Sequence, residues 1–382
     1  MVASVRELRP LTALRSWLAA STHRRAGTAA ATVLLAVGLA LGLVFVTATE
    51  PARPRAGSAT APPPSTASQP PRPARRERCP LTGVARTGNV PARPALAVKI
   101  GNEPYGARPQ SGLNEADVVF DTPAEGFIMR YIAVFQCTDA AEIGPVRSLR
   151  WVDWHIVRQF IHPILAFAGG IEPDVAAATA MRWLLAANLL EAAQAAGVRI
   201  SSRLPPDNLY TSTASLYGLF RQDRTPPRPI FTYSVRLPPG ARPAKALSID
   251  FSAGTDVTWR WEPSQHAWLH TYAGVPDVDA LTGRPVEATN VVVQIVRYRF
   301  GPYAESPGGS GDVESQTIGR GVGYVLRDGT VTKVTWYRRF LVDPTTFIGP
   351  GGRLVDLAPG RTWVELVPDT TAAAPGALVI TR

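Results

Sequence analysis

An uncharged apolar segment near the N-terminus, residues 26–48, is the feature that most limits how this chain can fold. About 20 apolar residues in a helix are enough to cross a hydrocarbon core of about 30 Å. Five arginines and one acid precede the segment, and positively charged residues stay on the cytoplasmic side. We therefore predict a cytoplasmic tail over residues 1–25, a transmembrane anchor over residues 26–48 and an extracytoplasmic remainder.

Two other interpretations of this segment are weaker. It could be a cleaved signal peptide, because Val46-Thr47-Ala48 resembles a cleavage site, but the apolar cores of signal peptides span only about 7–15 residues. It could be a buried helix of a soluble domain, but it has no polar face. No cysteine follows the segment closely, so we do not expect a lipid-modified N-terminus.

The positive charge of the chain is concentrated before Cys79. Of the 40 basic residues, 11 lie there with 3 of the 30 acids, so this part carries +8 of the formal +10. The remainder is nearly neutral, which argues against nucleic acid as a partner. Residues 49–78 are rich in proline, alanine, serine and arginine, and we predict a disordered, semi-extended linker there.

Two cysteines, Cys79 and Cys137, lie in the part predicted to be exported, where disulfides persist. Two cysteines allow one bridge, which would join the start of the folded region to the end of a predicted strand. The alternative is two separate thiols, one of them buried.

The pattern of the folded region changes near residue 225, and we predict an α+β fold with two domains. A mixed α/β domain is expected over residues 79–225 and a mainly β domain over residues 226–382, with a shared interface. Strands are predicted over 95–100, 116–121, 128–137 and 164–168. Helices are predicted over 148–160 and 212–221, and one or two helices over 172–197. After a TPPRP breaker, further strands are predicted over 248–252, 257–262, 267–272, 290–300, 323–339 and 361–368, with a hairpin at Asp328-Gly329.

Known catalytic motifs are absent from the sequence. It contains no GxxxxGK[ST], HExxH, GxSxG or CxxC, and the glycine-rich residues 319–323 indicate a turn or bulge rather than a phosphate loop. His266 and His270 would lie about 13 Å apart on one strand face, at about 3.3 Å per residue, which is too far for one zinc ion. We expect neither a metal nor a cofactor.

Polar residues gather at the predicted ends of strands before residue 225, beside glycines and prolines, where binding sites are usually built. Ser148 is a predicted N-cap, and the free amides of a helix N-terminus favour an anion that Arg147 and Arg150 could also bind. The alternative, which we weigh slightly higher, is that these arginines pair with nearby acids and hold loops together. The candidate ligand-binding residues are Asn102, Arg108, Gln110, Glu125, Arg130, Arg147, Ser148, Arg150 and Asn208.

Carboxylates in the same region could perform acid–base chemistry. The candidates are Glu115, Asp117, Glu125 and Asp207, but their spacing does not show that they converge. Glu125 and Arg130 are five residues apart, so in a regular strand they would face opposite sides.

Seven short motifs are spread over the folded region: CPLTG (79–83), ARPQSGLNEADVVF (107–120), AEGFIMRYIAVFQ (124–136), IGPVRSLR (143–150), DNLYTS (207–212), NVVVQ (290–294) and PGRTWVELVP (359–368). Together they resemble the YerB-like family of bacterial envelope proteins. The resemblance covers nearly all of residues 79–370 and implies a tethered protein outside the membrane, in a family with no settled activity. Two departures, Phe167-Ala168-Gly169-Gly170 and Pro206-Asp207-Asn208, stand where the family tends to have histidine, which weakens any histidine chemistry here.

Three functions are compatible with these observations. We favour a binding or scaffolding module of the cell envelope that recognises an anionic ligand or partner protein. The alternative is an extracytoplasmic hydrolase or transferase that acts on envelope polymers through carboxylates, so enzymatic activity stays open. A structural protein without a ligand is the third possibility.

Overall fold

The computed structural model describes residues 76–251, 255–305, 308–309 and 311–382, which all belong to one compact unit, residues 71–382. The predicted cytoplasmic tail, the anchor over residues 26–48 and residues 49–75 of the predicted linker lie outside the described residues. Within the described ranges, no helix is both long enough and apolar enough to span a bilayer.

The folded region begins at a disulfide between Cys79 and Cys137, whose sulfur atoms lie 2.16 Å apart. Just before it, Arg78 forms a backbone bridge with Ala85, and Glu77 accepts a hydrogen bond from the Val90 amide at 2.7 Å. The last residues of the predicted linker are therefore bonded to the folded region.

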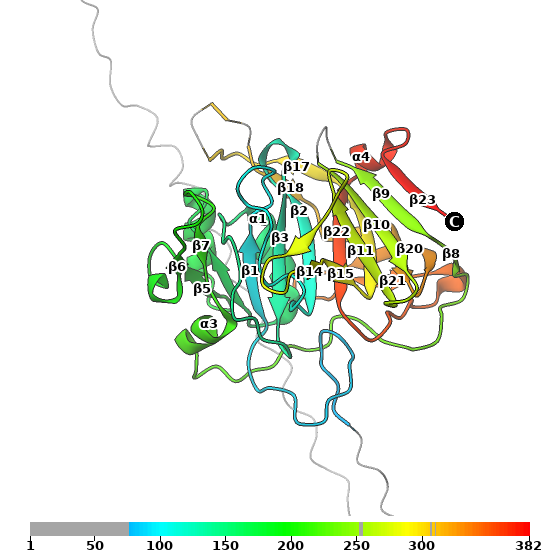
Figure 1. Ribbon diagram of the computed structural model, residues 1–382, viewed down its shortest axis with the longest axis horizontal. Coiled ribbons are helices and arrows are strands. Elements are labelled where there is room, and N and C mark those ends of the chain that lie inside the picture. The colour runs from blue at the N-terminus through cyan, green and yellow to red at the C-terminus, as the bar shows by residue number, and fades with distance from the viewer. Residues whose placement is uncertain (1–75, 252–254, 306–307, 310) are drawn as a thin grey trace, which may run out of the picture. The chain divides into compact units, whose positions relative to one another are not determined.

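A long mixed sheet runs through both halves of the chain (Figure 1). Strand β22 lies between β16 of the second half and β2 of the first half and is parallel to both. The predicted domain boundary near residue 225 is therefore not a boundary of the sheet. In order, the strands are β21 (Thr346–Ile348), β20 (Thr330–Arg338), β19 (Gly319–Arg327), β16 (Asn290–Val296), β22 (Thr362–Pro368), β2 (Val118–Pro123), β3 (Met129–Phe135), β1 (Leu96–Ile100), β4 (Ile164–Phe167) and β5 (Leu185–Asn188), with β8 (Arg242–Pro243) paired to β20.

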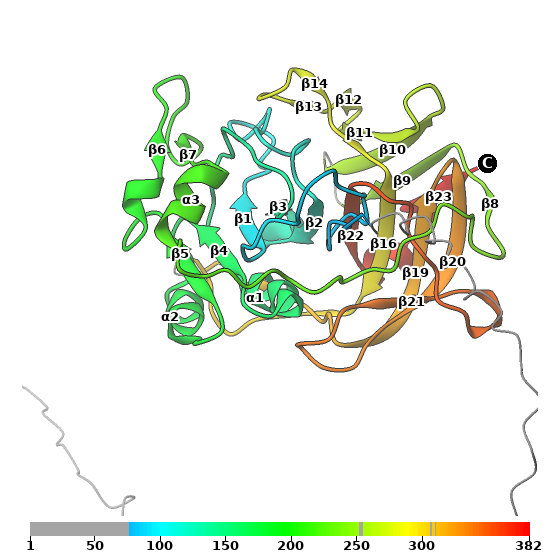
Figure 2. The same ribbon diagram turned by 90° about the horizontal axis from the view of Figure 1, so that it is seen from below.

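A second sheet covers one face of the long sheet over the strands of the second half (Figure 2). Its core side contributes Trp259 and Trp268, and the Trp259 ring contacts Trp363 of the long sheet with centroids 5.1 Å apart. Apolar side chains that alternate along both sheets thus form one buried layer. The strands are β12 (Val275–Pro276), β11 (Ala267–Tyr272), β10 (Asp256–Glu262), β9 (Ala246–Asp250) and β23 (Leu378–Thr381), with β15 (Glu287–Ala288) paired to β11.

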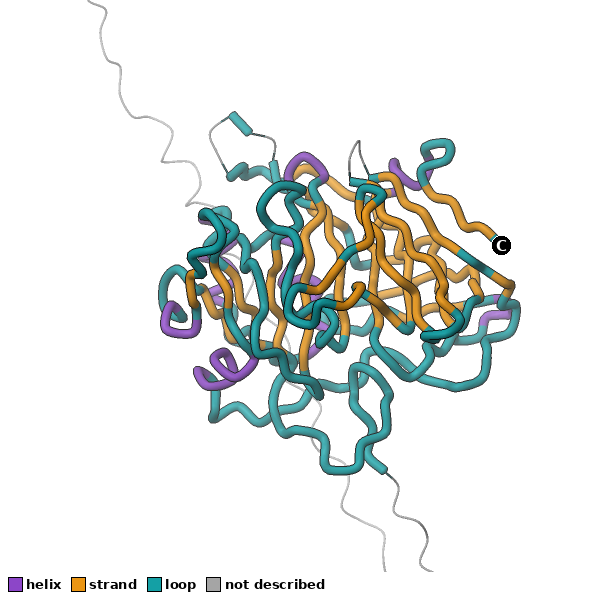
Figure 3. The backbone as a smooth tube through the Cα atoms, in the orientation of Figure 1, coloured by secondary structure: helices purple, strands orange, loops and turns teal. Residues whose placement is uncertain are grey.

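Helices are short and lie outside the sheets (Figure 3). Helix α1 (Trp151–Val157) and helix α2 (Glu172–Ala180) cover the other face of the long sheet, where a second apolar cluster includes Phe120, Phe160 and Phe231. The predicted α+β class, with a mixed first half and a mainly β second half, is confirmed. The remaining elements are α3 (Thr213–Leu219), α4 (Asp369–Ala373), β6 (Val198–Arg199), β7 (Leu209–Tyr210), β13 (Val278–Asp279), β14 (Arg284–Pro285), β17 (Tyr298–Phe300) and β18 (Val313–Ser315).

Two local predictions differ from the structure. The alanine-rich residues 172–197, predicted as one or two helices, form an α-helix only up to Ala180. Strand β5 follows and pairs in parallel with β4, because sheet pairing overrides helix propensity. The glycine-rich residues 319–323 are the start of strand β19 and not a turn. A Cβ atom on Gly321 would lie 2.6 Å from the Trp336 indole nitrogen, so the glycine allows a close approach of that ring.

The predicted hairpin at Asp328-Gly329 is confirmed. Asp328 has φ 50° and Gly329 has φ 63°, the left-handed conformation that a tight two-residue turn requires at both positions. The turn joins β19 and β20, which pair in register over their full length.

Candidate functional site

One edge of the long sheet brings several candidate residues together. Strands β1 and β4 are parallel, and β3 runs antiparallel to both β1 and β2. The C-terminal ends of β1, β2 and β4 therefore lie at the same edge as the start of β3, and ligand sites of α/β sheets form at such edges. Arg130 stands at the start of β3, and Arg147 and Arg150 come from the segment before α1. We call these three residues the arginine cluster.

The segment 143–150 is fixed in an extended conformation between β1 and the end of β4. The Arg147 amide donates a hydrogen bond to the Lys99 carbonyl at 3.0 Å, and the Arg147 carbonyl accepts one from the Ala168 amide at 3.0 Å. This backbone pairing holds both arginines of the segment at the edge of the sheet.

The helix that follows begins later than predicted. Its N-cap is Arg150, so the predicted N-cap at Ser148 is wrong. The Arg150 amide donates to Asp153 Oδ2 at 2.8 Å, and the Trp151 amide donates to Asp312 Oδ2 at 3.0 Å. The protein's own carboxylates thus occupy the amides that were predicted to attract an anion.

Arg147 is paired with two acids that sequence reasoning did not assign to it. Its Nε and Nη2 donate to Glu103 Oε1 at 3.2 and 2.6 Å, and its Nε lies 3.7 Å from Asp207 Oδ1. Burial alone would raise the pKa of Glu103, but the Arg147 hydrogen bond and the charge of Arg130 hold that pKa below its usual value.

Arg150 is fully buried among carboxylates. Its Nε lies 2.6 Å from Glu125 Oε1, and its Nη2 donates to Glu305 Oε2 at 2.6 Å. Ser148 also donates to Glu305, at 3.2 Å. Glu125 belongs to a short turn between β2 and β3, so the strand alternation predicted for Glu125 and Arg130 does not apply. The predicted pairing of an arginine with Glu125 is present, but neither Arg147 nor Arg150 pairs with Glu115 or Asp117.

Arg130 is the least satisfied member of the arginine cluster. Its side chain is buried, and its Nη2 lies 3.3 Å from Glu103 Oε1. Its Nε and Nη1 have no hydrogen-bond partner among the described residues. Burial, and after it the charge of Arg150, lowers the pKa of Arg130. Leaving buried donors unpaired is costly, so this guanidinium is the part of the cluster most open to an additional acceptor.

Carboxylates outnumber the three guanidinium groups at this edge, and two nearby carboxyls have a pKa close to neutrality. Burial raises the pKa of Asp312 to about 6. Burial and the neighbouring charge of Asp312 raise the pKa of Asp174 to about 7. The carboxylates within 4 Å of the arginine cluster are Glu103, Glu125, Asp207, Glu305 and Asp312.

The other candidate residues lie outside the arginine cluster. Asn102, Arg108 and Gln110 form a second group, in which Asn102 Oδ1 accepts from Gln110 Nε2 at 2.9 Å and from Arg108. Arg108 Nη2 lies 2.6 Å from Asp277 Oδ1. Asn208 belongs to neither group, since its Oδ1 accepts a hydrogen bond from Arg199 at 2.6 Å.

The carboxylate Asp117 has a structural role beside the disulfide. Its Oδ2 accepts hydrogen bonds from the amides of Gln136 and Cys137 at 2.6 and 2.9 Å. These bonds anchor the end of β3. Neither Asp117 nor Glu115 forms an ion pair with the arginine cluster.

Sequence reasoning missed a buried polar network between the two sheets. His270 Nδ1 lies 2.9 Å from Asp277 Oδ2, and Trp259 Nε1 donates to Glu365 Oε1 at 2.7 Å. Glu365 on β22 is the register neighbour of Asp121 on β2. In the sequence, Asp121 and Glu365 are each an acid within a mainly apolar strand. Nothing in either strand indicates that the other acid is its neighbour.

Asp121 and Glu365 are both fully buried and share their environment. Burial, and then the charge of Glu365, raises the pKa of Asp121 well above its usual value. Burial also raises the pKa of Glu365. Two adjacent carboxyls in an apolar layer are stable when one keeps its proton and donates a hydrogen bond to the other. The folded protein therefore binds a proton at this pair that the unfolded chain releases.

We expect Asp121→Asn to stabilise the protein at high pH. Above the ordinary aspartate pKa of about 3.9, the unfolded chain releases this proton and the folded chain keeps it, so wild-type stability falls as pH rises. Asparagine keeps a hydrogen-bond donor and removes the titration, and it should add about 1–3 kcal/mol at pH 8 and little at pH 4. Urea unfolding at both pH values measures this. The exposed Asp250→Asn is the control, and an equal loss of stability for D121N at both pH values would refute the prediction.

Comparisons with known proteins agree with this architecture. Residues 81–225 match a family model described as "Protein of unknown function (DUF3048) N-terminal domain", and residues 247–364 match the corresponding C-terminal domain. "Putative lipoprotein YerB" of Bacillus subtilis (strain 168) is 27% identical over 319 residues, covering 79% of this chain and 89% of the relative. The structure titled "Crystal structure of YerB protein from Bacillus subtilis" matches with a TM-score of 0.69 at 24% identity, over 80% of this chain and 100% of that chain, which shows the shared fold.

Proposed function

We propose that this chain, which belongs to the DUF3048, or YerB-like, family and carries its N- and C-terminal domains in order, is a membrane-tethered protein of the cell envelope. In this proposal, its folded part lies outside the cytoplasm and binds an anionic envelope component. The apolar residues 26–48, the arginines before them and the disulfide support this location. The name of the curated relative, a lipoprotein, points in the same direction.

The observation that carries the binding function is the incompletely paired guanidinium of Arg130. Two of its nitrogen atoms are buried and have no hydrogen-bond partner in the part of the chain that the structure describes. The third lies near Glu103, which also pairs with Arg147. A ligand carboxylate or phosphate that takes the place of the Glu103 carboxylate would face both guanidinium groups. Glu103 would then be an internal competitor for the ligand.

We expect Glu103→Gln to bind anions about tenfold more tightly than the wild type, because the competing charge is gone. Arg130→Gln should lose binding. The probes are inorganic phosphate and soluble cell-wall fragments, titrated against the full chain with unfolding temperature as the readout. Arg353→Gln, at an exposed position, is the control for a general loss of positive charge. Equal binding by wild type and R130Q would refute the proposal.

A hydrolase or transferase that uses carboxylates is the second candidate. The raised pKa values of Asp312, about 6, and Asp174, about 7, allow these groups to hold or release a proton near neutrality beside the arginine cluster. The same titration decides between the two functions. A binding protein returns the cell-wall fragments unchanged after incubation, whereas an enzyme alters their chromatographic profile.

A further inference from the structure

A groove opens between the two sheets. Its lining residues all come from the second half of the chain, and none of them belongs to the arginine cluster. It has a volume of about 560 Å³, within the range of small-molecule sites. Its walls come from β19 and β20 of the long sheet, from β23 of the second sheet, and from the residues around Arg242. Its apolar lining consists of Tyr324, Val331, Pro350, Leu378 and Ile380.

Strand alternation explains why the groove is apolar. Leu378 and Ile380 share one face of β23, are half-buried and pack against the core between the sheets, whereas Val379 between them is exposed on the other face. Val331 and Tyr324 extend the same core from the long sheet. The groove is therefore the open end of the apolar layer between the sheets, and an apolar chain placed there would continue that layer.

An exposed lysine, Lys333, stands on the groove side of β20. Lys333 follows Val331 by two residues on β20, so it points to the same side, and it is the register neighbour of Tyr324. Arg242 pairs by backbone with Val331 and also lines the groove. Neither Lys333 nor Arg242 forms an ion pair with any residue that the structure describes, and no acidic side chain lines the groove. Arg382 also lines the groove.

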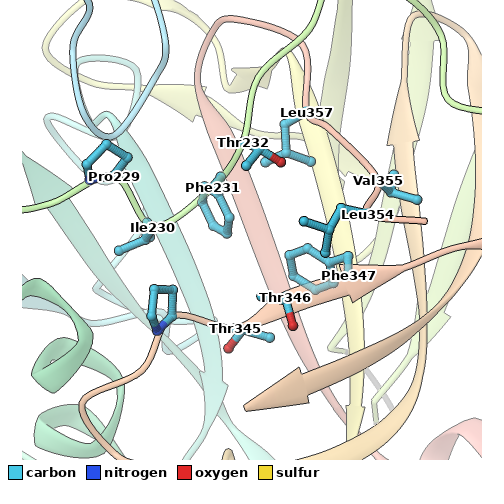
Figure 4. A pocket seen from close by; sticks show the side chains of 11 residues that line it. Pro229, Ile230, Phe231, Thr232, Thr345, Thr346, Phe347, Leu354, Val355 and Leu357 are labelled. Carbon is cyan, nitrogen blue, oxygen red and sulfur yellow. The ribbon is translucent and has the colours of Figure 1, made fainter. Parts of the chain in front are cut away.

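Two other cavities lack this combination. One, of about 200 Å³, lies between residues 229–232 and β21 and is lined by apolar residues and threonines without any charged side chain (Figure 4). Another, beside the disulfide, has Asp117 among its lining residues together with Arg86 and Arg361. Among these three cavities, an apolar wall with cations and no acid occurs in the groove alone.

We propose that the groove binds a single-chain amphiphile with an anionic head group. The apolar tail lies along Leu378, Ile380 and Val331, where each buried methylene favours binding. The head group, a phosphate or carboxylate, pairs with Lys333 and Arg242 at the rim. This site is separate from the arginine cluster, and it would bind its ligand even if the proposed function of that cluster were wrong.

The test is a calorimetric titration of residues 71–382 with dodecyl phosphate below its critical micelle concentration. This fragment is the compact unit, and the matched relative's solved chain corresponds to 80% of this chain. We expect saturable binding of dodecyl phosphate with one site. Inorganic phosphate lacks the tail and dodecyltrimethylammonium has the opposite charge, so both should bind at least tenfold more weakly. Equal binding of the cationic amphiphile would overturn the proposal.

Paired variants separate this site from non-specific adsorption. Lys333→Glu should weaken dodecyl phosphate binding at least tenfold, and Ile380→Asp should abolish it. The controls are Arg339→Glu, an exposed charge reversal that does not line the groove, and Val379→Asp, on the opposite face of β23. Both controls should bind as the wild type does. Because Lys333 is exposed, K333E should keep the wild-type unfolding temperature, and unchanged binding by K333E would refute the proposal.

Discussion

Replacing Asp153 with alanine is expected to lower the free energy of unfolding by about 3–5 kcal/mol. Lys99 Nζ lies 2.6 Å from Asp153 Oδ1, and both side chains are fully inaccessible to solvent. Burial lowers the pKa of Lys99, and the charge and hydrogen bond of Asp153 oppose that effect. Without Asp153, Lys99 on β1 has a buried charge without its carboxylate partner. The Arg150 amide also loses its acceptor at the start of α1.

A double variant distinguishes a lost charge partner from lost packing. Lys99→Met combined with Asp153→Leu removes both charges, so it should cost far less than D153A alone. The matched control is Asp139→Ala, which breaks the exposed pair with Arg93 and should cost at most about 1 kcal/mol. Urea unfolding at pH 7 measures all three variants. If D153A and D139A lost the same stability, the buried pair would not contribute as described.

Removing the disulfide by Cys79→Ala and Cys137→Ala is expected to cost about 4 kcal/mol. The bond spans 58 positions of sequence, and the chain-entropy model assigns about this stabilisation to a loop of that length. The reduced wild type should show the same loss, which urea unfolding with and without reductant measures. The double alanine variant is its own control, because reductant should not change its stability.

The disulfide between Cys79 and Cys137 also tests whether the folded part lies outside the cytoplasm. In cells, a thiol-alkylating reagent added before lysis should leave both cysteines of the wild type unmodified if the folded part lies outside the cytoplasm, because disulfides persist there. Alkylation of both residues under these conditions would contradict the proposed location. An unfolding midpoint that reductant leaves unchanged would contradict the predicted stabilisation.

Local signals predicted much of the fold. Apolar runs found the central strands, and Asp328-Gly329 specified its hairpin because only a few residues accept that backbone conformation. Proximity of Arg147 and Arg150 followed from their closeness in sequence. The strand Leu185–Asn188 could not be predicted, because an alanine-rich segment becomes a strand only through pairing with β4.

The candidate site was harder to predict, because its partners come from distant segments. Glu305 and Asp312 reach Arg150 from more than 150 residues away in sequence. Asn208 directly follows Asp207, which lies near Arg147, yet Asn208 bonds to Arg199, and Arg108 pairs with Asp277 in another group. Spacing along the chain carries no information about such contacts, whereas the register of β2 and β22 determines directly that Asp121 meets Glu365.

The position of β22 has a consequence for how the protein matures. Residues 118–121 of β2 pair with residues 362–365, so this strand of the first family domain has an open edge until β22 has been synthesised. The residues of β2 are synthesised about 240 positions before those of β22, so during synthesis this edge is unpaired first and covered later. The two family domains thus share one sheet, and β22, a strand from late in the sequence, joins them.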